Sequence, residues 1–266
     1  MKRVLITGAA GRIGQSLSAR LADRYDLRLL YHRTVPDEHA AATARARESG
    51  APVRIPGLAA GDGLAERPTE LFVADAQDLE AMQRACAGVD AVVHMAGDPR
   101  VPAPWESILA NNIVGLRNTY EAARLAGVRK IVFASSNHAT GVYEQRGLYT
   151  TPDMPVRPDS YYGVSKAFGE ALGAHFSDEF GLSVICLRIG SFQERPRNER
   201  HLSTWLSERD AAQLVWRSIE ADVPFAIVYA ISGNTRAYWD ISSARELLGY
   251  APEDDGETYA AELVGK

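Results

Sequence analysis

The stretch Thr7-Gly8-Ala9-Ala10-Gly11-Arg12-Ile13-Gly14 follows directly after the apolar run Val4-Leu5-Ile6, and it decides the fold. Glycines at this spacing, between a strand and a helix, allow a tight turn at Gly8, a close approach of phosphate at Gly11 and close helix packing at Gly14. The helix that starts here offers free backbone amides, which bind a pyrophosphate. The stretch therefore predicts nucleotide binding, and the alternative is a turn with a structural role only.

Outward from this turn, short apolar runs alternate with helical stretches. The runs lack polar alternation, which is typical of strands buried on both faces of a sheet. The expected strands are residues 3–7, 27–31, 70–74, 91–95, 130–135, 183–189 and 225–229, and the expected helices are residues 13–23, 79–87, 105–126, 160–180, 208–220 and 242–248. This order predicts an α/β fold, namely a Rossmann-type doubly wound parallel sheet with right-handed crossovers.

The length suits one domain over residues 1–266, with a small C-terminal substrate-binding lobe contributed mainly by residues 190–206 and 230–266. Residues 33–69 interrupt the alternation as an insertion, in which a helix-like stretch at 38–49 is followed by a loop rich in proline and glycine. The insertion either covers the adenosine end of a cofactor or is a surface excursion without a role.

The composition is that of an ordinary globular protein, with 46% apolar and 24% charged residues. A net charge of −5 argues against nucleic acid or an anionic membrane as a partner. No apolar run reaches about 18 residues, so no membrane span is expected. Cys86 and Cys186 allow neither a disulfide framework nor a zinc site, and the start of the chain lacks the features of a signal peptide, so a reducing cytoplasm is expected. The six histidines show no ligand spacing, so no metal is expected.

Tyr162 and Lys166 stand four residues apart on the expected helix 160–180. This spacing places a phenol and an ammonium one turn apart on the same face. We expect the ammonium to lower the pKa of the phenol and to make Tyr162 a candidate acid/base.

Ser136 ends the fifth strand, at the edge of the sheet where ligands bind, and its hydroxyl can hydrogen-bond a substrate oxygen as charge shifts. Ser136, Tyr162 and Lys166 therefore predict an enzyme that moves hydride and proton together. Tyr162 removes the hydroxyl proton, while Lys166 stabilises the phenolate and anchors the nicotinamide ribose. A serine hydrolase is disfavoured because the chain has no Gly-x-Ser-x-Gly elbow.

The second strand ends in Tyr31-His32-Arg33, and no acid follows until Asp37. An acid at this place would hold the ribose 2′-hydroxyl of NAD, whereas an arginine would accept the 2′-phosphate of NADP. The sequence therefore predicts NADP or NAD as the cofactor, with a slight preference for NADP through Arg33. The alternative is that Arg33 is a solvated start to the insertion.

Other residues at strand ends have two interpretations each. Asp75 accepts a hydrogen bond from an adenine amino group or caps the next helix, for which Asp78 is better placed. His94 is interpreted as a packed histidine, and Asn112 either supports the active site or is a buried, satisfied amide. The expected cofactor-binding residues are Gly8, Gly11, Arg12, Ile13, Gly14, Arg33, Asp75, Ala76, Met95, Ala96, Gly97, Asn112 and Ile189.

In order and over nearly the whole chain, the glycine motif, Asn112, Ser136, Tyr162 and Lys166 resemble the extended short-chain dehydrogenase/reductases, the superfamily of NAD-dependent epimerases and dehydratases. A narrower resemblance is to uronate dehydrogenases and related aldose dehydrogenases. It rests on Phe133-Ala134-Ser135-Ser136-Asn137-His138, Tyr162-Gly163-Val164-Ser165-Lys166, Arg188-Ile189-Gly190-Ser191, Arg200 with Leu202-Ser203-Thr204-Trp205, and Trp239-Asp240. It implies oxidation of C1 of a hexuronate to the lactone with NAD, and related enzymes act on neutral or phosphorylated aldoses.

The resemblance also implies substrate contacts. Asn137, His138 and Ser191 would contact sugar hydroxyls together with Ser136 and Tyr162, and Arg200 would face the substrate's carboxylate. An arginine fork suits a planar carboxylate and would also take a phosphate. The alternative for Arg200 is a surface arginine in a polar loop, and the alternative for His138 is a loop histidine without a role. The loop Asp98-Pro99-Arg100-Val101 stands where the uronate enzymes usually have a small apolar residue and a serine. Arg100 adds a second cation near the substrate, and two arginines would suit a dianion such as a sugar phosphate.

Two departures from the uronate enzymes affect cofactor choice: Tyr31 replaces their aspartate, and the insertion is longer. The expected function is NAD(P)-dependent oxidation of C1 of a hexuronate or related aldose by a homo-oligomer. One alternative is a nucleotide-sugar epimerase or dehydratase, although those enzymes have a longer C-terminal part and an Asn-x-x-Gly-Pro segment in place of Ile189-Gly190-Ser191. The other is a non-catalytic NADP-binding regulator, although such proteins commonly lose the tyrosine or the lysine.

Overall fold

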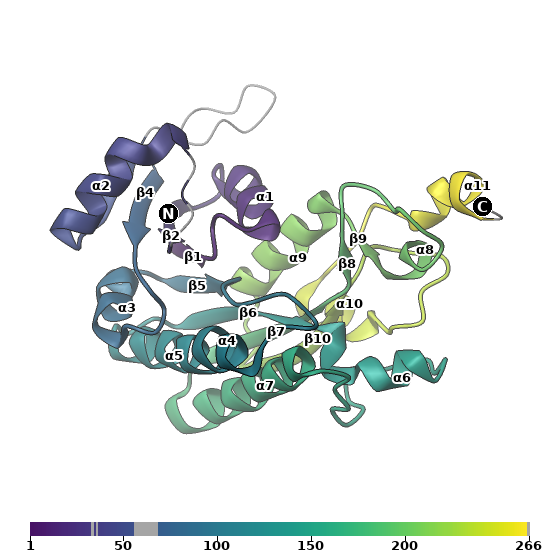
Figure 1. Ribbon diagram of the computed structural model, residues 1–266. Coiled ribbons are helices and arrows are strands. Elements are labelled where there is room, and N and C mark those ends of the chain that lie inside the picture. The colour runs from purple at the N-terminus through teal and green to yellow at the C-terminus, as the bar shows by residue number, and fades with distance from the viewer. Residues whose placement is uncertain (33–34, 36, 56–68, 265–266) are drawn as a thin grey trace.

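Strands and helices alternate along the computed structural model, which describes residues 1–32, 35, 37–55 and 69–264 (Figure 1). The strands are β1 (Arg3–Thr7), β2 (Asp26–Tyr31), β3 (Val53–Ile55), β4 (Thr69–Val73), β5 (Ala91–His94), β6 (Lys130–Ser136), β7 (Ser183–Ile189), β8 (Ser191–Phe192), β9 (Trp205–Leu206) and β10 (Phe225–Ala230). The helices are α1 (Arg12–Leu21), α2 (Ala40–Ser49), α3 (Leu79–Cys86), α4 (Trp105–Ser107), α5 (Gly115–Leu125), α6 (Gly141–Gln145), α7 (Tyr161–Phe180), α8 (His201–Thr204), α9 (Glu208–Glu220), α10 (Ser242–Leu248) and α11 (Ala260–Leu263).

Eight of these strands form one sheet in the order β10-β7-β6-β5-β1-β2-β4-β3. All neighbours pair in parallel except β3, which runs antiparallel at the edge. The order reverses between β1 and β5, and sheets of this kind bind dinucleotides at the carboxyl ends of the strands at that point. The predicted Rossmann-type fold is therefore confirmed.

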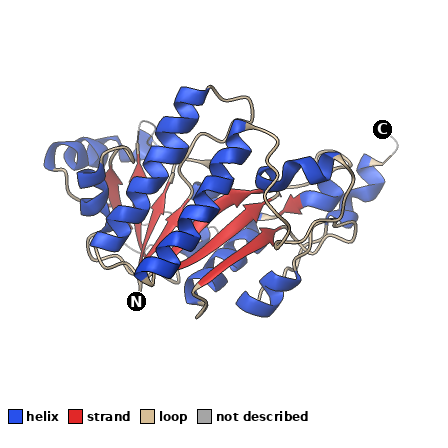
Figure 2. Ribbon diagram, turned by 90° about the horizontal axis from the view of Figure 1, so that it is seen from below, coloured by secondary structure: helices blue, strands red, loops and turns tan. Residues whose placement is uncertain are grey.

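Apolar side chains leave the sheet on both faces, as expected for strands without polar alternation. One buried cluster joins the sheet to α1, α2, α9 and α10, and a second joins it to α3, α5 and α7. Figure 2 shows the sheet between these two layers of helices. Side-chain caps fix the start of several helices, since Asp78 accepts from the amide of Ala81 at 3.0 Å and Ser160 from that of Gly163 at 3.0 Å.

The predicted strands lie within one residue of those observed, but three features differ. The helix expected over residues 105–126 is divided into α4, the π-helical segment η2 (Ile108–Val114) and α5. Two very short parallel strands, β8 and β9, pair after β7 and were not expected. The third difference is β3, which extends the sheet from inside the predicted insertion.

The described part of the insertion is therefore an extension of the fold, in which β3 pairs with β4 and α2 packs against β4. Residues 33–34, 36 and 56–68 of this segment lie outside the described residues. No helix in the described part of the chain is both long and apolar enough to cross a membrane.

Candidate active site

The turn between β1 and α1 needs glycine at Gly8 and Gly14. Gly8 has a φ of 67°, and a Cβ there would lie 2.8 Å from the backbone nitrogen of Ala96. A Cβ on Gly14 would lie 2.3 Å from the carbonyl oxygen of Gly8. Gly11 caps α1 without a side-chain hydrogen bond, which leaves the first amides of the helix available to an anion. The turn thus fits the pyrophosphate that the sequence predicts.

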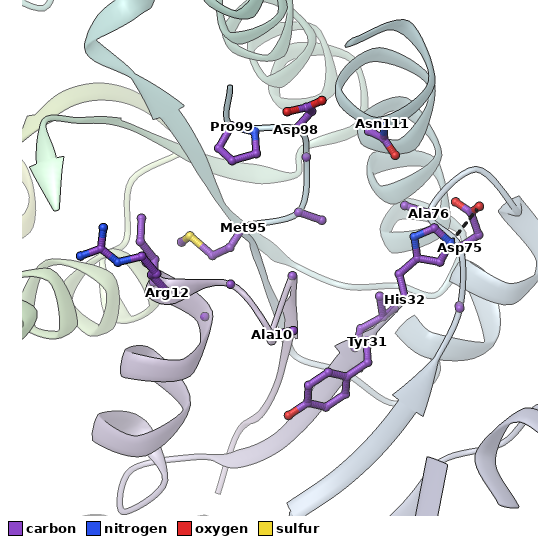
Figure 3. Close-up of a pocket in the computed structure, with 18 of the residues that line it drawn as sticks. Ala10, Arg12, Tyr31, His32, Asp75, Ala76, Met95, Asp98, Pro99 and Asn111 are labelled. Atoms are coloured by element: carbon purple, nitrogen blue, oxygen red, sulfur yellow. Dashed lines mark ion pairs between the residues drawn. The ribbon is translucent and has the colours of Figure 1, made fainter. Parts of the chain in front are cut away.

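A cavity of about 710 Å³, here called the large cavity, opens beside this turn (Figure 3). Ligand pockets commonly have volumes of this order. Its walls come from the carboxyl ends of β1, β2, β4 and β5, where the fold binds dinucleotides. Most of the predicted cofactor-binding residues line it: Gly8, Gly11, Arg12, Ile13, Gly14, Asp75, Ala76, Met95, Ala96 and Gly97.

Of the other predicted cofactor-binding residues, Asn112 and Ile189 do not line the large cavity. Arg33 lies outside the described residues. Asn112 is buried behind the cavity wall, where its amide accepts from the backbone nitrogen of Asp98 at 2.7 Å and donates to Ser165 Oγ at 3.1 Å. Ile189 lines a second, adjoining cavity. Asn112 therefore holds the loop after β5 against α7, from a π-helical turn of the kind often found at functional sites.

The loop after β4 carries Asp75 into the large cavity. Its carboxylate lies 3.2 Å from His32 Nε2, as the dashed line in Figure 3 marks. Asp78, not Asp75, caps α3, as the sequence indicated. Tyr31 and His32, at the end of β2, also line the cavity.

A second cavity of about 180 Å³, here called the small cavity, brings Ser136, Tyr162 and Lys166 together. Ser136 ends β6, and the other two lie on the first turns of α7. The two cavities share part of their lining, namely Ile13, Met95, Ala96, Gly97, Asp98, Pro99 and Phe192. A ligand in the large cavity can therefore extend to the hydroxyl groups of Ser136 and Tyr162.

Burial controls the charge of Tyr162 and Lys166 in the protein alone. It raises the pKa of the Tyr162 phenol, against the lowering effect of a hydrogen bond with Ser136. Burial also lowers the pKa of Lys166 to about 8, although the nearby Glu170 acts to raise it. Lys166 Nζ donates to the carbonyl of Ala134 at 2.7 Å and lies 5.3 Å from the centre of the Tyr162 ring.

The expected lowering of the Tyr162 pKa by Lys166 is therefore wrong for the protein alone. Desolvation by burial is the largest cause of the raised pKa of Tyr162, and it exceeds the lowering by the hydrogen bond with Ser136.

His94 is a packed histidine, as the sequence indicated. It is 1% exposed, and its Nδ1 lies 3.1 Å from Thr7 Oγ1, which also accepts from the backbone nitrogen of Ala96 at 3.2 Å. Burial, reinforced by the charge of Lys166, lowers the pKa of His94 to about 3. His94 is thus neutral at physiological pH and joins the ends of β1 and β5.

Arg100 lines the large cavity rather than the small one. Its guanidinium donates to Asp98 Oδ1 at 2.9 Å, and the same carboxylate accepts from Ser107 Oγ at 2.6 Å. The arginine holds the pKa of the Asp98 carboxyl well below its usual range. Arg100, which the sequence suggested as a second cation for the substrate, is therefore already paired with an acid.

Arg200 directly precedes α8, and its guanidinium lies in a cluster of polar side chains. It donates to both carboxylate oxygens of Glu144, with Nη2 at 2.9 Å, and to Ser191 Oγ at 3.0 Å. Its Cζ also lies 5.8 Å from the centre of the Trp239 ring. Neither Arg200 nor Ser191 is an isolated surface side chain, since a compact polar cluster contains both.

Asn137 and His138 directly follow Ser136 in the sequence. Asn137 lies between Ser136 and Glu144, and His138 lies beside Tyr162. The amide of Asn137 lies 3.4 Å from Ser136 Oγ on one side and 3.5 Å from Glu144 on the other. His138 Nδ1 lies 2.8 Å from Asp159, and its ring meets the Tyr162 ring edge-on at 5.6 Å. Four of the five predicted substrate-binding residues, all but Arg100, are thus connected to Ser136 or Tyr162 directly or through Glu144, although none of the four lines the small cavity.

Sequence reasoning missed several residues of the site. Glu144 lies on the short α6 helix, in no recognisable pattern, and only the fold brings it to Arg200. Phe192, on β8, lines both cavities. Among the described residues, no group of three or more His, Cys, Asp or Glu side chains could hold a metal ion.

A glycine turn at the switch point of a doubly wound sheet, with a Tyr-x-x-x-Lys helix beside it, defines a dinucleotide-dependent protein of the short-chain type. Residues 4–228 match the family described as "NAD dependent epimerase/dehydratase family", and the chain belongs to this family.

Known proteins resemble the chain over nearly its full length. It is 42% identical to an "NAD-dependent glucose-6-phosphate dehydrogenase" of Haloferax volcanii, covering 97% of this chain and 96% of that protein. It is 38% identical to a "Uronate dehydrogenase" of Pseudomonas syringae pv. tomato, covering 98% and 85%. The crystal structure of a mutant uronate dehydrogenase from Agrobacterium tumefaciens complexed with NAD superposes with a TM-score of 0.81, at 36% identity, over 99% of this chain and 89% of that one.

Proposed function

We propose that the protein is an NAD(P)-dependent dehydrogenase that oxidises C1 of a hexuronate or a related aldose, phosphorylated ones included, to the lactone. The C1 hydroxyl loses its proton, C1 loses a hydride to the oxidised cofactor, and lactone, reduced cofactor and one proton result. The observation that carries the proposal is the shared wall of the two cavities, because it lets a dinucleotide beside Gly8–Gly14 reach the hydroxyls of Ser136 and Tyr162.

In this proposal Tyr162 is the general base that takes the C1 hydroxyl proton. Ser136 hydrogen-bonds the same substrate oxygen. Lys166 binds the nicotinamide ribose and stabilises the phenolate. When bound, the cofactor supplies the hydride acceptor and a positive nicotinamide ring. The resulting charge offsets the burial that raises the pKa of Tyr162 in the protein alone.

Two kinds of support point to a sugar as the small-molecule substrate. The relatives named above are called dehydrogenases of a sugar phosphate and of uronates. In addition, the polar side chains connected to Ser136 and Tyr162 offer groups that suit the hydroxyls of a sugar, namely the amide of Asn137, the hydroxyl of Ser191, the imidazole of His138 and the guanidinium of Arg200. We propose that these four residues contact the substrate. A cytoplasmic location is part of the proposal, and the two buried free cysteines agree with it.

For the cofactor we propose NAD or NADP, bound along the large cavity. The prediction that NADP is preferred rests on Arg33 alone, and the names of the relatives favour NAD. An Arg33→Ala variant tests it. If Arg33 binds the 2′-phosphate, the ratio of kcat/KM with NADP to kcat/KM with NAD falls by about tenfold or more. An unchanged ratio removes Arg33 from cofactor selection.

The function is tested by incubating the protein with NAD or NADP and a panel of aldoses, hexuronates, sugar phosphates and nucleotide sugars. Reduced cofactor is followed by absorbance, and the product is identified as a lactone by NMR. Turnover of a free or phosphorylated sugar to its lactone is the expected result. Conversion of nucleotide sugars alone, without net reduction of the cofactor, would instead indicate an epimerase, and binding without turnover would indicate a regulator.

A further inference from the structure

The guanidinium of Arg200 is already paired with an acid of the same chain. Its Nε and Nη2 both donate to the carboxylate of Glu144, in the two-pronged geometry that guanidinium and carboxylate groups prefer. Tyr238 adds a hydrogen bond to the same carboxylate, from its hydroxyl to Oε1 at 2.7 Å. The edge of Arg200 best suited to a planar carboxylate is therefore filled before any substrate binds.

Glu144 also belongs to the substrate side of the site. A chain of polar contacts leads from Ser136 through Asn137 to Glu144, and from there through Arg200 to Ser191. Ser136 lines the small cavity together with Tyr162, and Gly190 and Phe192, the neighbours of Ser191, line it as well. The Glu144–Arg200 pair is thus connected to residues beside the small cavity, and neither of the two lines the large cavity.

Three other cations of the described residues lie near the site, and none of them offers a free charge beside Arg200. Arg100 is held by Asp98, on the side of the large cavity. His138 Nδ1 lies 2.8 Å from Asp159. Lys166 lies next to Tyr162, at the reacting end. A negatively charged group placed against Arg200 would therefore share one guanidinium with Glu144.

We propose that Glu144 is a specificity-determining residue, which occupies the place of a substrate carboxylate on Arg200 and directs the site to aldoses whose C6 group is not a carboxylate. The inference rests on the proposed oxidation of sugars at C1. The N–H groups of Arg200 that Glu144 and Ser191 leave free can each donate to a neutral hydroxyl. A hexuronate in the same position would bring a second carboxylate next to that of Glu144, and like charges in contact are strongly disfavoured.

The test compares glucose with glucuronate, which differ only at C6, in the wild type and in Glu144→Gln, with the cofactor that gives turnover. The glutamine keeps the shape, and its single carbonyl oxygen can still accept from Arg200 Nε and Tyr238, but it lacks the charge and loses the bond from Arg200 Nη2. Since the side chain of Arg200 is 43% exposed, solvent screens part of the effect, and we expect a change of about tenfold rather than several hundredfold. Galactose and galacturonate provide a second pair with the same difference.

The expected result is a higher kcat/KM for the aldose than for its uronate in the wild type, and a shift of that ratio by about tenfold or more toward the uronate in Glu144→Gln. Glu144→Asp keeps the charge and should keep the preference for the aldose. Glu121→Gln is the matched control, because Glu121 forms a similar two-pronged pair with Arg124 on α5, and its ratio should equal that of the wild type.

Three outcomes would overturn the inference. A wild type that prefers the uronate, with equal losses on both sugars in Glu144→Gln, would make Glu144 a structural partner of Arg200 and leave the proposed function intact. Equal changes of the ratio in the glutamine and aspartate variants would show that charge is not the cause. If neither sugar of any pair is converted by the wild type, the proposed function itself fails, and the inference fails with it.

Discussion

Tyr162 can act as a base only if its phenol loses a proton, and its surroundings resist that loss. Burial raises its pKa, whereas Ser136 acts to lower it. Replacing Tyr162 by phenylalanine keeps the ring, and with it the edge-on contact to His138. Because only the proton acceptor is lost, kcat should fall by at least ~10²-fold while the dissociation constant of the cofactor stays nearly the same.

The measurement is steady-state turnover of the best sugar in the panel, together with cofactor binding by calorimetry. Tyr161→Phe is the matched control, since Tyr161 is 61% exposed on the same turn of α7. Full activity in Tyr162→Phe would remove this phenol from the reaction.

The pH dependence of the reaction follows from the protonation of Tyr162 and Lys166. The productive form needs Tyr162 without its proton and Lys166 with one, so the pair must lose one proton but not two. The pKa of Lys166 is lowered to about 8, and that of Tyr162 is raised. Oxidative kcat/KM should therefore rise with pH until the first proton has left, around pH 8, and fall when the second leaves in the strongly alkaline range.

The profile is measured from about pH 6 to about pH 11 in buffers of constant ionic strength. The two midpoints belong to the coupled pair and not to either residue. A profile that falls between neutral pH and the pKa of Lys166 would contradict the assignment of base and cation.

At the scale of elements, α7 is fixed by a buried ion pair. Glu170 of α7 accepts from Arg188 of β7 through two bonds of 2.9 Å, and from Ser135 of β6 at 2.6 Å. Both charged side chains are at most 2% exposed. Since Lys166 stands one turn before Glu170, this pair also sets the position of the catalytic turn against the sheet.

Glu170→Gln should therefore destabilise the protein by about 3 kcal/mol or more, because Arg188 keeps its charge in the interior without a counter-charge. Urea unfolding gives the free energy. Glu257→Gln breaks a two-pronged pair with Arg236 that is more than one third exposed, and solvent screening should leave the free energy of unfolding nearly unchanged. Equal losses in the two variants would mean that burial does not decide the strength of these pairs.

The elements also show what the sequence could predict. The glycine turn and the Tyr-x-x-x-Lys helix are local, so their spacing alone placed Gly8, Gly14, Tyr162 and Lys166 correctly in the structure. The acidic partners of Arg100 and Arg200 were not predicted. Glu144 and Arg200 lie 56 positions apart, Glu144 on the short α6 and Arg200 directly before the short α8, and neither helix is long enough to show periodicity. The break of the helix at 105–126 was missed as well, because a π-helical turn depends on the contacts of Asn112 with Asp98 and Ser165.

At the scale of the whole molecule, the net charge of the protein differs from the balance of charge near the proposed sugar site. The protein carries a net charge of −5, yet each of the two arginines near the proposed substrate is paired with one acid. We propose that a cofactor phosphate binds instead to the uncharged amides at the start of α1, which no side chain caps. The fold thus keeps most of its fixed charge neutralised where the sugar is proposed to bind.

The predicted homo-oligomer belongs to this scale too. Exposed apolar side chains gather where α4 and η2 lie beside the start of α7: Trp105 is 45% exposed, Leu109 40%, Tyr161 61% and Val164 44%. The rings of Trp105 and Tyr161 lie 5.5 Å apart, so these side chains are continuous across the two elements. Adjoining exposed apolar side chains commonly mark a protein–protein contact. We therefore expect a dimer through this face.

Light scattering after gel filtration should give twice the mass of the 29.0 kDa chain for the wild type. A Leu109→Lys, Val164→Lys double variant places charges in the contact and should run as a monomer, since burying them unpaired in an interface is costly. Leu247→Lys is the control, because Leu247 is 48% exposed on α10, away from this face. A monomeric wild type would contradict the prediction, and a dimer that survives the double variant would move the contact to another face.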